Sequence, residues 1–555
     1  MTGSRISRRR LLGAAAAGAL GVGVGAAGGG LGSRGSWAGA ASPLGLAGRD
    51  PSGRGVLPAG TRPDPRQAAG TDLVRAIERF VVVMMENHSF DNLLGMMGRG
   101  DCLAKGPDGR PTITLPDGHG DLVHAFHMPS ECQTNGVGNN WNLAHHSYAA
   151  GANTGFVEAS TGESLGYFLR SDLPFTWSLA GTYPIADRWF SSVLGQTDPN
   201  RRYLLAGTSL GQIADNFPDD LPPNGTVFDL FNRFGLTWKD YFSNLPSAGV
   251  WLPLLAQPAI TEHLVPIDSF FADAAAGRLP QFSLVEPDYT KSSEENPQDI
   301  QFGDQFLADV VNAVTLGPQW SNTMLIWTYD EWGGWYDHVP PPMAVTPDNV
   351  APDLSPNSAR GRFDRYGFRV PAGVVSPLAR ADFVSHRVYD HTSVLKTLER
   401  KWNLPALTRR DANAHDLFDM VDLDSPPAFG SPRALAIPAN PALSASCLVT
   451  GPGRIPPKSA VDKGAVHDTP TIRPQQLPAG IVGVPYRATL KASPTGGRPR
   501  WSVLSDDLPA GLLLDPHTGA ITGTPTAAGT SGVTVGVQRR GGPVGARSYR
   551  VTVAT

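Results

Sequence analysis

Short apolar runs alternate with helical patterns between about residues 72 and 440. Because these runs have no polar face, they are typical of strands buried on both sides of a sheet. Their alternation with helices predicts an α/β domain, with a parallel sheet and crossover helices, over residues 72–447. The expected strands are 80–85, 282–285, 324–329 and 370–375, and two of the expected helices are 304–314 and 392–402.

The chain beyond residue 447 has a different pattern. Residues 448–468 are rich in glycine, proline and lysine, which is typical of a linker. Residues 469–555 alternate polar and apolar positions between Gly/Pro turns, which predicts a small all-β sandwich. Within it, residues 508–530 resemble the immunoglobulin-like modules of secreted bacterial proteins. They contain no cluster of histidines, cysteines or paired acids, so we expect an interaction or spacer role, such as binding cell-envelope components.

The N-terminus has the pattern of an export signal. Arg8 and Arg9 precede two leucines and an apolar stretch that runs to about Ala27, and small residues follow at 38–40. This order predicts a twin-arginine signal over residues 1–45, which directs a folded protein out of the cytoplasm. The alternative is an uncleaved membrane anchor. Residues 46–71 lack periodicity and predict a flexible leader. We therefore expect a secreted or envelope-associated protein.

Composition and charge exclude several classes of protein. The 63 glycines and 50 prolines are about a fifth of the 555 residues, while 41% of the residues are hydrophobic, so a wholly disordered chain is excluded. The net charge of −4 without long basic runs argues against a nucleic-acid partner. Removing the five arginines of residues 1–45 leaves about −9, which disfavours attraction to anionic lipid. No apolar span long enough for a transmembrane segment follows the N-terminus.

The chain has three cysteines, so they cannot all pair with one another. Cys102 and Cys132 are close enough in sequence to form one disulfide in an oxidising exterior, which would leave Cys447 single. The alternative is that this bridge is absent. The pattern contains no Cys-x-x-Cys motif and does not indicate zinc.

Two pairs of oxygen-bearing side chains follow two of the expected strands. Glu86 and Asn87 come directly after 80–85, and Asp330 and Glu331 directly after 324–329. Ligands of α/β sheets bind beyond the carboxyl ends of the strands, and three carboxylates held together there repel one another unless a cation lies between them. An all-oxygen set favours Ca²⁺, Mg²⁺ or Mn²⁺ over iron, and zinc least. The alternative is a helix cap at Glu86 and a solvated turn at Asp330.

Two further groups of residues are candidates for chemistry. Thr197, Asn200 and Arg201 combine a hydroxyl, an amide and a guanidinium within five residues, which suits a nucleophile beside phosphate-binding donors, although a simple turn is the alternative. His145, His338 and His391 lie in polar loops or at a helix start, where a general acid operates. A structural role is the alternative for each of them.

Five long motifs carry a resemblance to a known family. They follow one another in order over roughly residues 72–440: MMENHSFDNLLG (84–95), LPFTWSLAGTYPIADRWFSSVLGQTDPNRRYLLAGT (173–208), YDEWGGWYDHVPPP (329–342), GFRVPAGVVSP (367–377) and YDHTSVLKTLERKW (389–402). In these motifs the chain resembles the bacterial phosphoesterase family, which contains phosphatidylcholine-type phospholipases C and related acid phosphatases. The resemblance implies an alkaline-phosphatase-like sheet with helices on both faces.

The resemblance also implies roles for individual residues. It assigns Glu86, Asn87, Asp330 and Glu331 to one divalent metal ion, and makes Thr197 both a metal ligand and the nucleophile. Asn200 and Arg201 are then expected to bind the substrate phosphate. A histidine, taken from His145, His338 and His391, is expected to protonate the leaving alcohol.

Two departures from the family leave the general acid open. Relatives often have histidine where this chain has Asn139, and again where it has Asn296; asparagine binds phosphate but cannot transfer a proton. We expect an exported phospholipase C that cuts phosphatidylcholine-like lipids, with Trp332, Trp335 and Tyr336 forming either a head-group cavity or core. The alternatives are an acid phosphatase that acts on small phosphoesters and a surface-binding protein with a relic catalytic domain.

Overall fold

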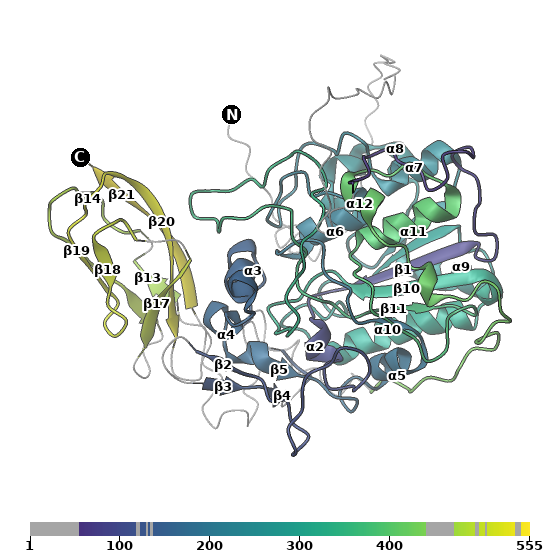
Figure 1. Cartoon of the computed structure of the whole chain (residues 1–555), viewed down its shortest axis with the longest axis horizontal. Coiled ribbons are helices and arrows are strands. Elements are labelled where there is room, and N and C mark those ends of the chain that lie inside the picture. The colour runs from purple at the N-terminus through teal and green to yellow at the C-terminus, as the bar shows by residue number, and fades with distance from the viewer. Residues whose placement is uncertain are drawn as a thin grey trace, which may run out of the picture.

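The computed structural model describes residues 55–117, 122–128, 131–133, 137–439, 471–474, 476–493, 499–505, 508–538 and 545–554. The predicted signal (1–45) and linker (448–468) lie outside the described residues, as does the first part of the predicted leader. Figure 1 shows an α/β body and a smaller β module at the C-terminus. Within the described part of the chain, no helix has the length and apolar character needed to span a bilayer.

One eight-stranded sheet forms the centre of the body. Its strand order is β12-β6-β11-β10-β1-β9-β7-β8. Strands β10, β1, β9, β7 and β8 run parallel, but β11 is antiparallel to both β10 and β6. The sheet is therefore mixed, whereas the sequence predicted a parallel sheet. The strands are β1 (Arg79–Met85), β6 (Ile185–Ala186), β7 (Trp238–Phe242), β8 (Leu264–Pro266), β9 (Phe282–Glu286), β10 (Thr323–Tyr329), β11 (Ala372–Val375) and β12 (Val384–Ser385).

Helices cover both faces of this sheet, as predicted. In Figure 1, α6 and α11 lie on one face and α5 and α10 on the other. The helices are α2 (Phe90–Leu93), α3 (Trp141–Tyr148), α4 (Phe156–Ala159), α5 (Pro174–Thr182), α6 (Thr197–Ala206), α7 (Val227–Phe234), α8 (Pro258–Thr261), α9 (Ile267–Ala275), α10 (Ile300–Thr315), α11 (Thr392–Trp402) and α12 (Arg409–Asn413). Small strands lie at β2 (Thr114–Pro116), β3 (Leu122–His124), β4 (Phe126–His127) and β5 (Gly166–Tyr167).

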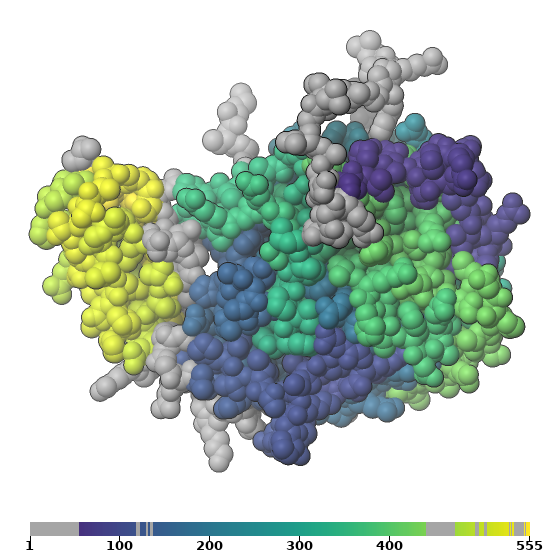
Figure 2. Space-filling view, in the orientation of Figure 1, coloured from purple at the N-terminus to yellow at the C-terminus, as the bar shows by residue number. Residues whose placement is uncertain are grey.

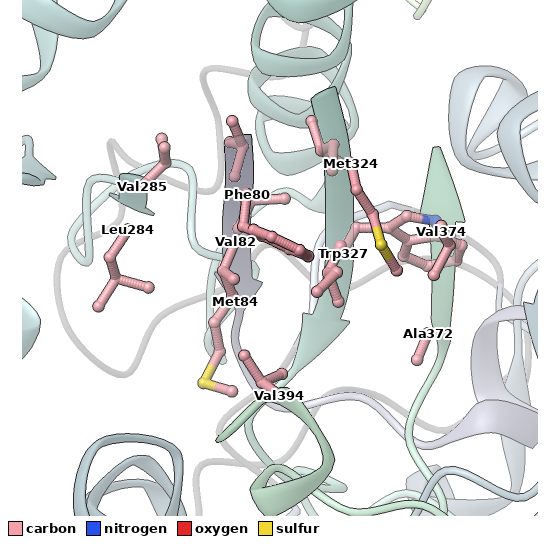
Figure 3. Close-up of a cluster of buried hydrophobic side chains, with 14 of the residues drawn as sticks. Phe80, Val82, Met84, Leu284, Val285, Met324, Trp327, Ala372, Val374 and Val394 are labelled. Carbon is pink, nitrogen blue, oxygen red and sulfur yellow. The ribbon is translucent and has the colours of Figure 1, made fainter. Parts of the chain in front are cut away.

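The central strands are apolar because both of their faces are covered. Every residue of β10 is buried, and β1 is buried from Phe80 onward. Figure 3 shows side chains of β1, β9, β10 and β11 packed together with Val394 of α11. A fully apolar strand therefore ends abruptly at the polar residues that follow it, which places those residues at one edge of the sheet.

The structure differs from one prediction about the start of the body and decides one question that the sequence left open. Part of the expected flexible leader is fixed to the body: the backbone amide of Gly60 donates to Ala406 O at 2.7 Å, and that of Asp64 donates to Asn403 Oδ1 at 2.9 Å. Of the two alternatives for Cys102 and Cys132, the structure shows the one without a disulfide between them, because Cys102 is a free thiol. The Cys102 sulfur lies against backbone oxygens of its own loop instead.

The C-terminal module is all-β. Its two larger sheets have the orders β14-β21-β20-β17 and β15-β19-β18, and side chains from both sheets enclose one hydrophobic core around Trp501 and Val535. Strand β17 also contacts α3 of the body. The strands are β13 (Thr471–Arg473), β14 (Gly480–Ile481), β15 (Tyr486–Thr489), β16 (Lys491–Ser493), β17 (Arg500–Ser505), β18 (Leu512–Leu514), β19 (Ala520–Gly523), β20 (Gly529–Gln538) and β21 (Gly545–Ala554).

Candidate active site

The two predicted acidic pairs meet at one edge of the sheet. Strands β1 and β10 are parallel neighbours whose last residues, Met85 and Tyr329, are in register, so Glu86 and Asp330 follow side by side. The backbone amide of Asn87 donates to Asp330 Oδ1 at 3.1 Å. Glu86, Asn87, Asp330 and Glu331 are all buried. The sequence prediction that these side chains come together is consistent with this geometry.

Thr197 reaches the same place from the first turn of α6. Its hydroxyl donates to Asn87 Oδ1 at 3.3 Å, and its side chain is nearly buried. The turn alternative for this segment is wrong, since Thr197 begins a ten-residue helix. Because the first amides of a helix carry partial positive charge, its N-terminus favours an anionic oxygen or phosphate beside Thr197.

Asn200 holds the loop that enters α6. Its side-chain amide donates to Gly195 O and to Gln196 O, both at 3.0 Å, and its Oδ1 accepts from the backbone amide of Val193 at 3.0 Å. These bonds use the carboxamide within the protein. The structure therefore differs from the expected phosphate-binding role, and gives Asn200 the task of shaping the turn before Thr197.

The guanidinium of Arg201 likewise bonds to groups of the protein, so it is not available for the phosphate contact that the resemblance implies. Its Nε donates to Asp330 Oδ2 at 3.0 Å, and one terminal nitrogen donates to Glu286 Oε2 at 2.8 Å. The other terminal nitrogen lies 3.5 Å from Glu86 Oε1 and donates to the carbonyls of Met84 and Met85. The guanidinium is completely buried. It therefore fixes the acidic residues instead of meeting substrate.

The charges in this region suit an added cation. Four buried carboxyl groups lie here, those of Glu86, Glu286, Asp330 and Glu331, and three of them pair with Arg201. Burial, together with the charge of Asp330, raises the pKa of Glu331 well above its usual range. A bound divalent cation relieves such repulsion, and the carboxylate, amide and hydroxyl oxygens here are ligands that hard cations prefer. The chemistry of these donors therefore fits the expected metal ion, although the carboxylate oxygens of Glu86, Asp330 and Glu331 do not all lie within 4.8 Å of one another.

A second acidic group lies elsewhere and holds an arginine. Asp91, Asp337 and His338 are the group within the described residues whose ligand atoms all lie within 4.8 Å of one another. Arg369 donates to Asp91 at 3.0 Å and to Asp337 at 2.9 Å, while the His338 ring contacts Asp91 at 2.7 Å and Asp101 at 3.2 Å. Because the guanidinium and the imidazole already balance these carboxylates, we assign the group to an ion-pair network.

The three candidate histidines occupy structural positions. Within the described residues, none of them hydrogen-bonds to Thr197. The Nδ1–H of His145 donates to Trp141 O at 2.8 Å, and His338 belongs to the ion-pair network. The Nε2–H of His391 donates to Asp330 O at 2.6 Å, and burial lowers the pKa of His391 to about 4. The structure thus gives none of them the position expected of a general acid.

Asn139 is a site residue that the pattern of the sequence did not identify as one. Its side-chain amide donates to Glu331 Oε1 at 2.5 Å, while the other oxygen of Glu331 accepts from the backbone amide of Gly333 at 2.8 Å. Both carboxylate oxygens of Glu331 are therefore positioned. The polar segment before α3 gave no periodic signal, and only its departure from the family motif drew attention to Asn139.

The aromatic residues of the expected head-group cavity do not form a cavity at the candidate site. Trp332 and Trp335 are completely buried and Tyr336 is nearly so, so they are core and not a head-group cavity. One cavity among the described residues, of about 690 Å³, lies at the β12 edge and includes Arg380, Phe383 and Arg400 in its lining. None of the candidate site residues lines this cavity. The candidate site is therefore located by the oxygen-bearing side chains at the sheet edge and not by a cavity.

Comparisons with known proteins give the family. The Phosphoesterase family model matches residues 77–405, and the Ig-like domain model He_PIG matches residues 469–554. Non-specific phospholipase C6 of Arabidopsis thaliana is 30% identical over 65% of this chain and 75% of its own length. Non-hemolytic phospholipase C of Pseudomonas aeruginosa is 29% identical over 60% of this chain and 54% of its own.

A protein in the alkaline phosphatase superfamily from Vibrio parahaemolyticus aligns over 65% of this chain and 72% of its own, with 12% identity and a TM-score of 0.31.

The position of Asn139 leads to a first prediction. Asn139→Asp keeps the size of the side chain but replaces the donor with a second carboxylate beside Glu331, so we expect it to displace Glu331 and weaken divalent-cation binding by roughly 10–100-fold. Asn140→Asp is the matched control, because Asn140 is the exposed N-cap of α3 and aspartate caps a helix equally well. Calorimetric titration with Ca²⁺, Mg²⁺ and Mn²⁺ measures the effect. Equal affinities in the two variants would contradict the assignment.

The ion-pair network leads to a second prediction, on pH. Burial opposes protonation of His338, but Asp91 and Asp337 outweigh it and raise the pKa of the ring to about 9. Because the folded pKa is raised, the stabilisation is complete below about pH 6.5, the usual value for histidine, and is lost as pH rises through about 9. Urea unfolding should show the difference between wild type and His338→Gln shrinking over that range.

His386→Gln is the control for this experiment, because His386 also pairs with an aspartate, Asp187 at 2.8 Å, but its ring is 70% exposed. A His338→Gln difference that stays constant from pH 6.5 to 9.5 would show that the charge of His338 does not stabilise the fold.

Proposed function

We propose that this chain, which belongs to the Phosphoesterase family, is an exported, metal-dependent phospholipase C that cuts phosphatidylcholine-like lipids into diacylglycerol and a phosphorylated head group. The family and its phospholipase C relatives establish a phosphoric ester hydrolase. The observation that carries the finer proposal is the contact between the Thr197 hydroxyl and Asn87 Oδ1, at 3.3 Å, beside a buried surplus of carboxyl groups.

Glu86, Asn87, Asp330, Glu331 and Thr197 are the residues that we propose hold the ion. When bound, a divalent cation lowers the pKa of a hydroxyl that it touches and offsets the charge of a phosphate. Calcium, magnesium or manganese suits the oxygen set best. Arg201 fixes Glu86 and Asp330, while Asn139 and the Gly333 amide fix Glu331. The side chains are thus held in place before substrate arrives.

In the proposed reaction the Thr197 oxygen attacks phosphorus in line with the leaving alcohol. A bond forms between the Thr197 oxygen and phosphorus, and the bond between phosphorus and the diacylglycerol oxygen breaks. The hydroxyl proton of Thr197 passes to water, and the departing diacylglycerol oxygen takes a proton from water. Water then hydrolyses the phosphothreonine and releases the phosphorylated head group. The N-terminal amides of α6, which begins at Thr197, favour the negative charge that the phosphate oxygens carry.

Export and the role of the β module are parts of the same proposal. The Arg8-Arg9 pair and the apolar stretch after it support export by the twin-arginine route to the envelope or the exterior. The module at 469–554 matches an Ig-like domain model and contacts the body through β17 and α3. We propose that it binds cell-envelope components, since it adds no residue to the site described above.

An assay of two substrates tests the function. The chain from residue 46 onward, given phosphatidylcholine and p-nitrophenyl phosphate, should release phosphocholine from the lipid, and chelator should abolish the release until metal is restored. Free phosphate from the monoester alone would indicate an acid phosphatase. Turnover of neither substrate with metal present would indicate a binding protein and overturn the proposal.

Two variants of Thr197 test the nucleophile. Thr197→Ala removes one hydroxyl and should lower kcat by roughly 10⁴-fold or more, as removal of a nucleophile does in other hydrolases. Thr197→Ser retains the hydroxyl and should keep most of the activity. Circular dichroism checks that both variants fold. An alanine variant as active as the serine variant would rule out Thr197 as the nucleophile.

A further inference from the structure

One long segment leaves and re-enters the sheet at the catalytic edge. Strand β10 ends at Tyr329 and the antiparallel β11 begins at Ala372, and Thr328 lies opposite Ala372. Both ends of the segment between them therefore lie at the edge that carries Asp330 and Glu331. Residues 330–371, all of which the structure describes, contain no helix or strand. Both ends of the segment are thus fixed at the edge of the sheet that carries Asp330 and Glu331.

The segment is anchored on both sides of the site. On one side, Trp141 Nε1 donates to Ala359 O at 2.8 Å, and the backbone amide of Ala359 donates to Asn142 Oδ1 at 2.6 Å. These anchors belong to α3, which begins two residues after Asn139. On the other side, the Thr208 hydroxyl donates to Asp348 Oδ2 at 2.5 Å, just after the end of α6. The segment therefore bridges the two helices adjoining the site and is held in one position.

Its outer part is apolar and exposed. Met343, Val350 and Leu354 are 43%, 42% and 36% exposed, and they are three of the nine exposed large hydrophobic residues in the described body. A third of that set thus falls within twelve residues of chain. Figures 1 and 2 show this segment, coloured between teal and green, standing out from the body on the side that faces the yellow module.

The charge of the segment restricts what it can contact. Residues 339–359 contain no lysine or arginine, and the arginines that reach them bond to the protein: Arg365 donates to Met343 Sδ at 2.8 Å and to Pro341 O at 2.7 Å, and Arg409 donates to Asn349 Oδ1 at 3.0 Å. Of the two acids in this range, Asp348 is tied to Thr208. A surface that binds anionic lipid carries a cluster of basic residues that are free to meet phosphate, so the engagement of these arginines with protein groups favours a zwitterionic partner. The acidic balance of the whole chain agrees with this choice.

We propose that residues 343–354 form a lipid-docking surface, which inserts Met343, Val350 and Leu354 shallowly into a zwitterionic phospholipid surface and turns the catalytic edge of the sheet toward it. This proposal rests on the proposed phospholipase function. Exposed apolar side chains on an anchored loop gain free energy by entering the boundary between head groups and acyl chains. The enzyme would then reach its substrate without leaving the membrane surface.

The experiment compares vesicle binding with catalysis. A triple variant, Met343→Ser with Val350→Ser and Leu354→Ser, should bind phosphatidylcholine vesicles at least about tenfold more weakly, since three apolar side chains leave the contact. Its activity on monomeric short-chain phosphatidylcholine should stay within about twofold of wild type, because none of these residues lies in the catalytic machinery. Cosedimentation measures binding, and it is done with the Thr197→Ala substitution in both proteins so that hydrolysis does not alter the vesicles.

The matched control is Leu316→Ser. Leu316 is 78% exposed at the C-cap of α10, close before the start of β10 and so at the opposite edge of the sheet. It should leave vesicle binding unchanged. A further variant, Met343→Trp, should strengthen binding severalfold, which misfolding cannot produce.

Each result has a defined meaning. Wild-type binding by the triple variant, equal loss in Leu316→Ser, or tighter binding of wild type to phosphatidylglycerol than to phosphatidylcholine would overturn the docking surface. Failure of the wild type to cleave phosphatidylcholine in monomers and in vesicles would overturn the proposed function instead, and vesicle binding by the Thr197→Ala proteins would still test the surface. Loss of vesicle binding and vesicle turnover, with monomer turnover kept, would support both.

Discussion

The guanidinium of Arg201 joins the parts on which the site depends. It pairs with Glu86 after β1, with Glu286 at the end of β9 and with Asp330 after β10, which are three adjacent strands of the sheet. Arg201 lies one helical turn beyond Thr197, so the same ion pairs fix the start of α6 against the acidic edge. A buried arginine that lost these partners would be strongly unfavourable, and so would the acids without it. The position of Thr197 therefore follows from a balance of buried charge.

The guanidinium of Arg201 does not pair with every buried carboxyl group at this edge, and the one it leaves out is Glu331. Glu331 is not among the partners of Arg201, and it is held instead by Asn139 and the amide of Gly333. His391 supports the same edge from behind through the carbonyl of Asp330. Neutral donors orient these groups without cancelling their charge. This edge of the sheet therefore has the negative charge and the oxygen ligands that the proposed cation requires.

The sequence pattern predicted those parts of the molecule that depend on local burial. The apolar run 80–85 and the acidic residues after it were sufficient to place Glu86 at a strand end, and 392–402 was recognised as a helix with the bounds of α11. It did not reveal α6, because polar and apolar residues of this helix are buried alike, so its sequence shows no apolar stripe, and the helix begins with residues typical of turns. The roles of Arg201, Asn139 and the histidines depend on partners distant in sequence, so neither periodicity nor spacing indicates them. The strand expected at 370–375 is β11, but its antiparallel direction was not predicted, because burial on both faces looks the same in either strand direction.

The central claim is that the carboxylates at this edge hold one divalent cation. It is tested most directly by dialysing chelator-treated protein against Ca²⁺, Mg²⁺ or Mn²⁺ and measuring the metal retained per chain by mass spectrometry. The account predicts about one ion in the wild type, its loss in Glu86→Gln and in Asp330→Asn, and its retention in Glu158→Gln, whose carboxylate pairs with His146 away from this edge. A wild type that retains no divalent ion, or variants of Glu86 and Asp330 that retain it fully, would contradict the account.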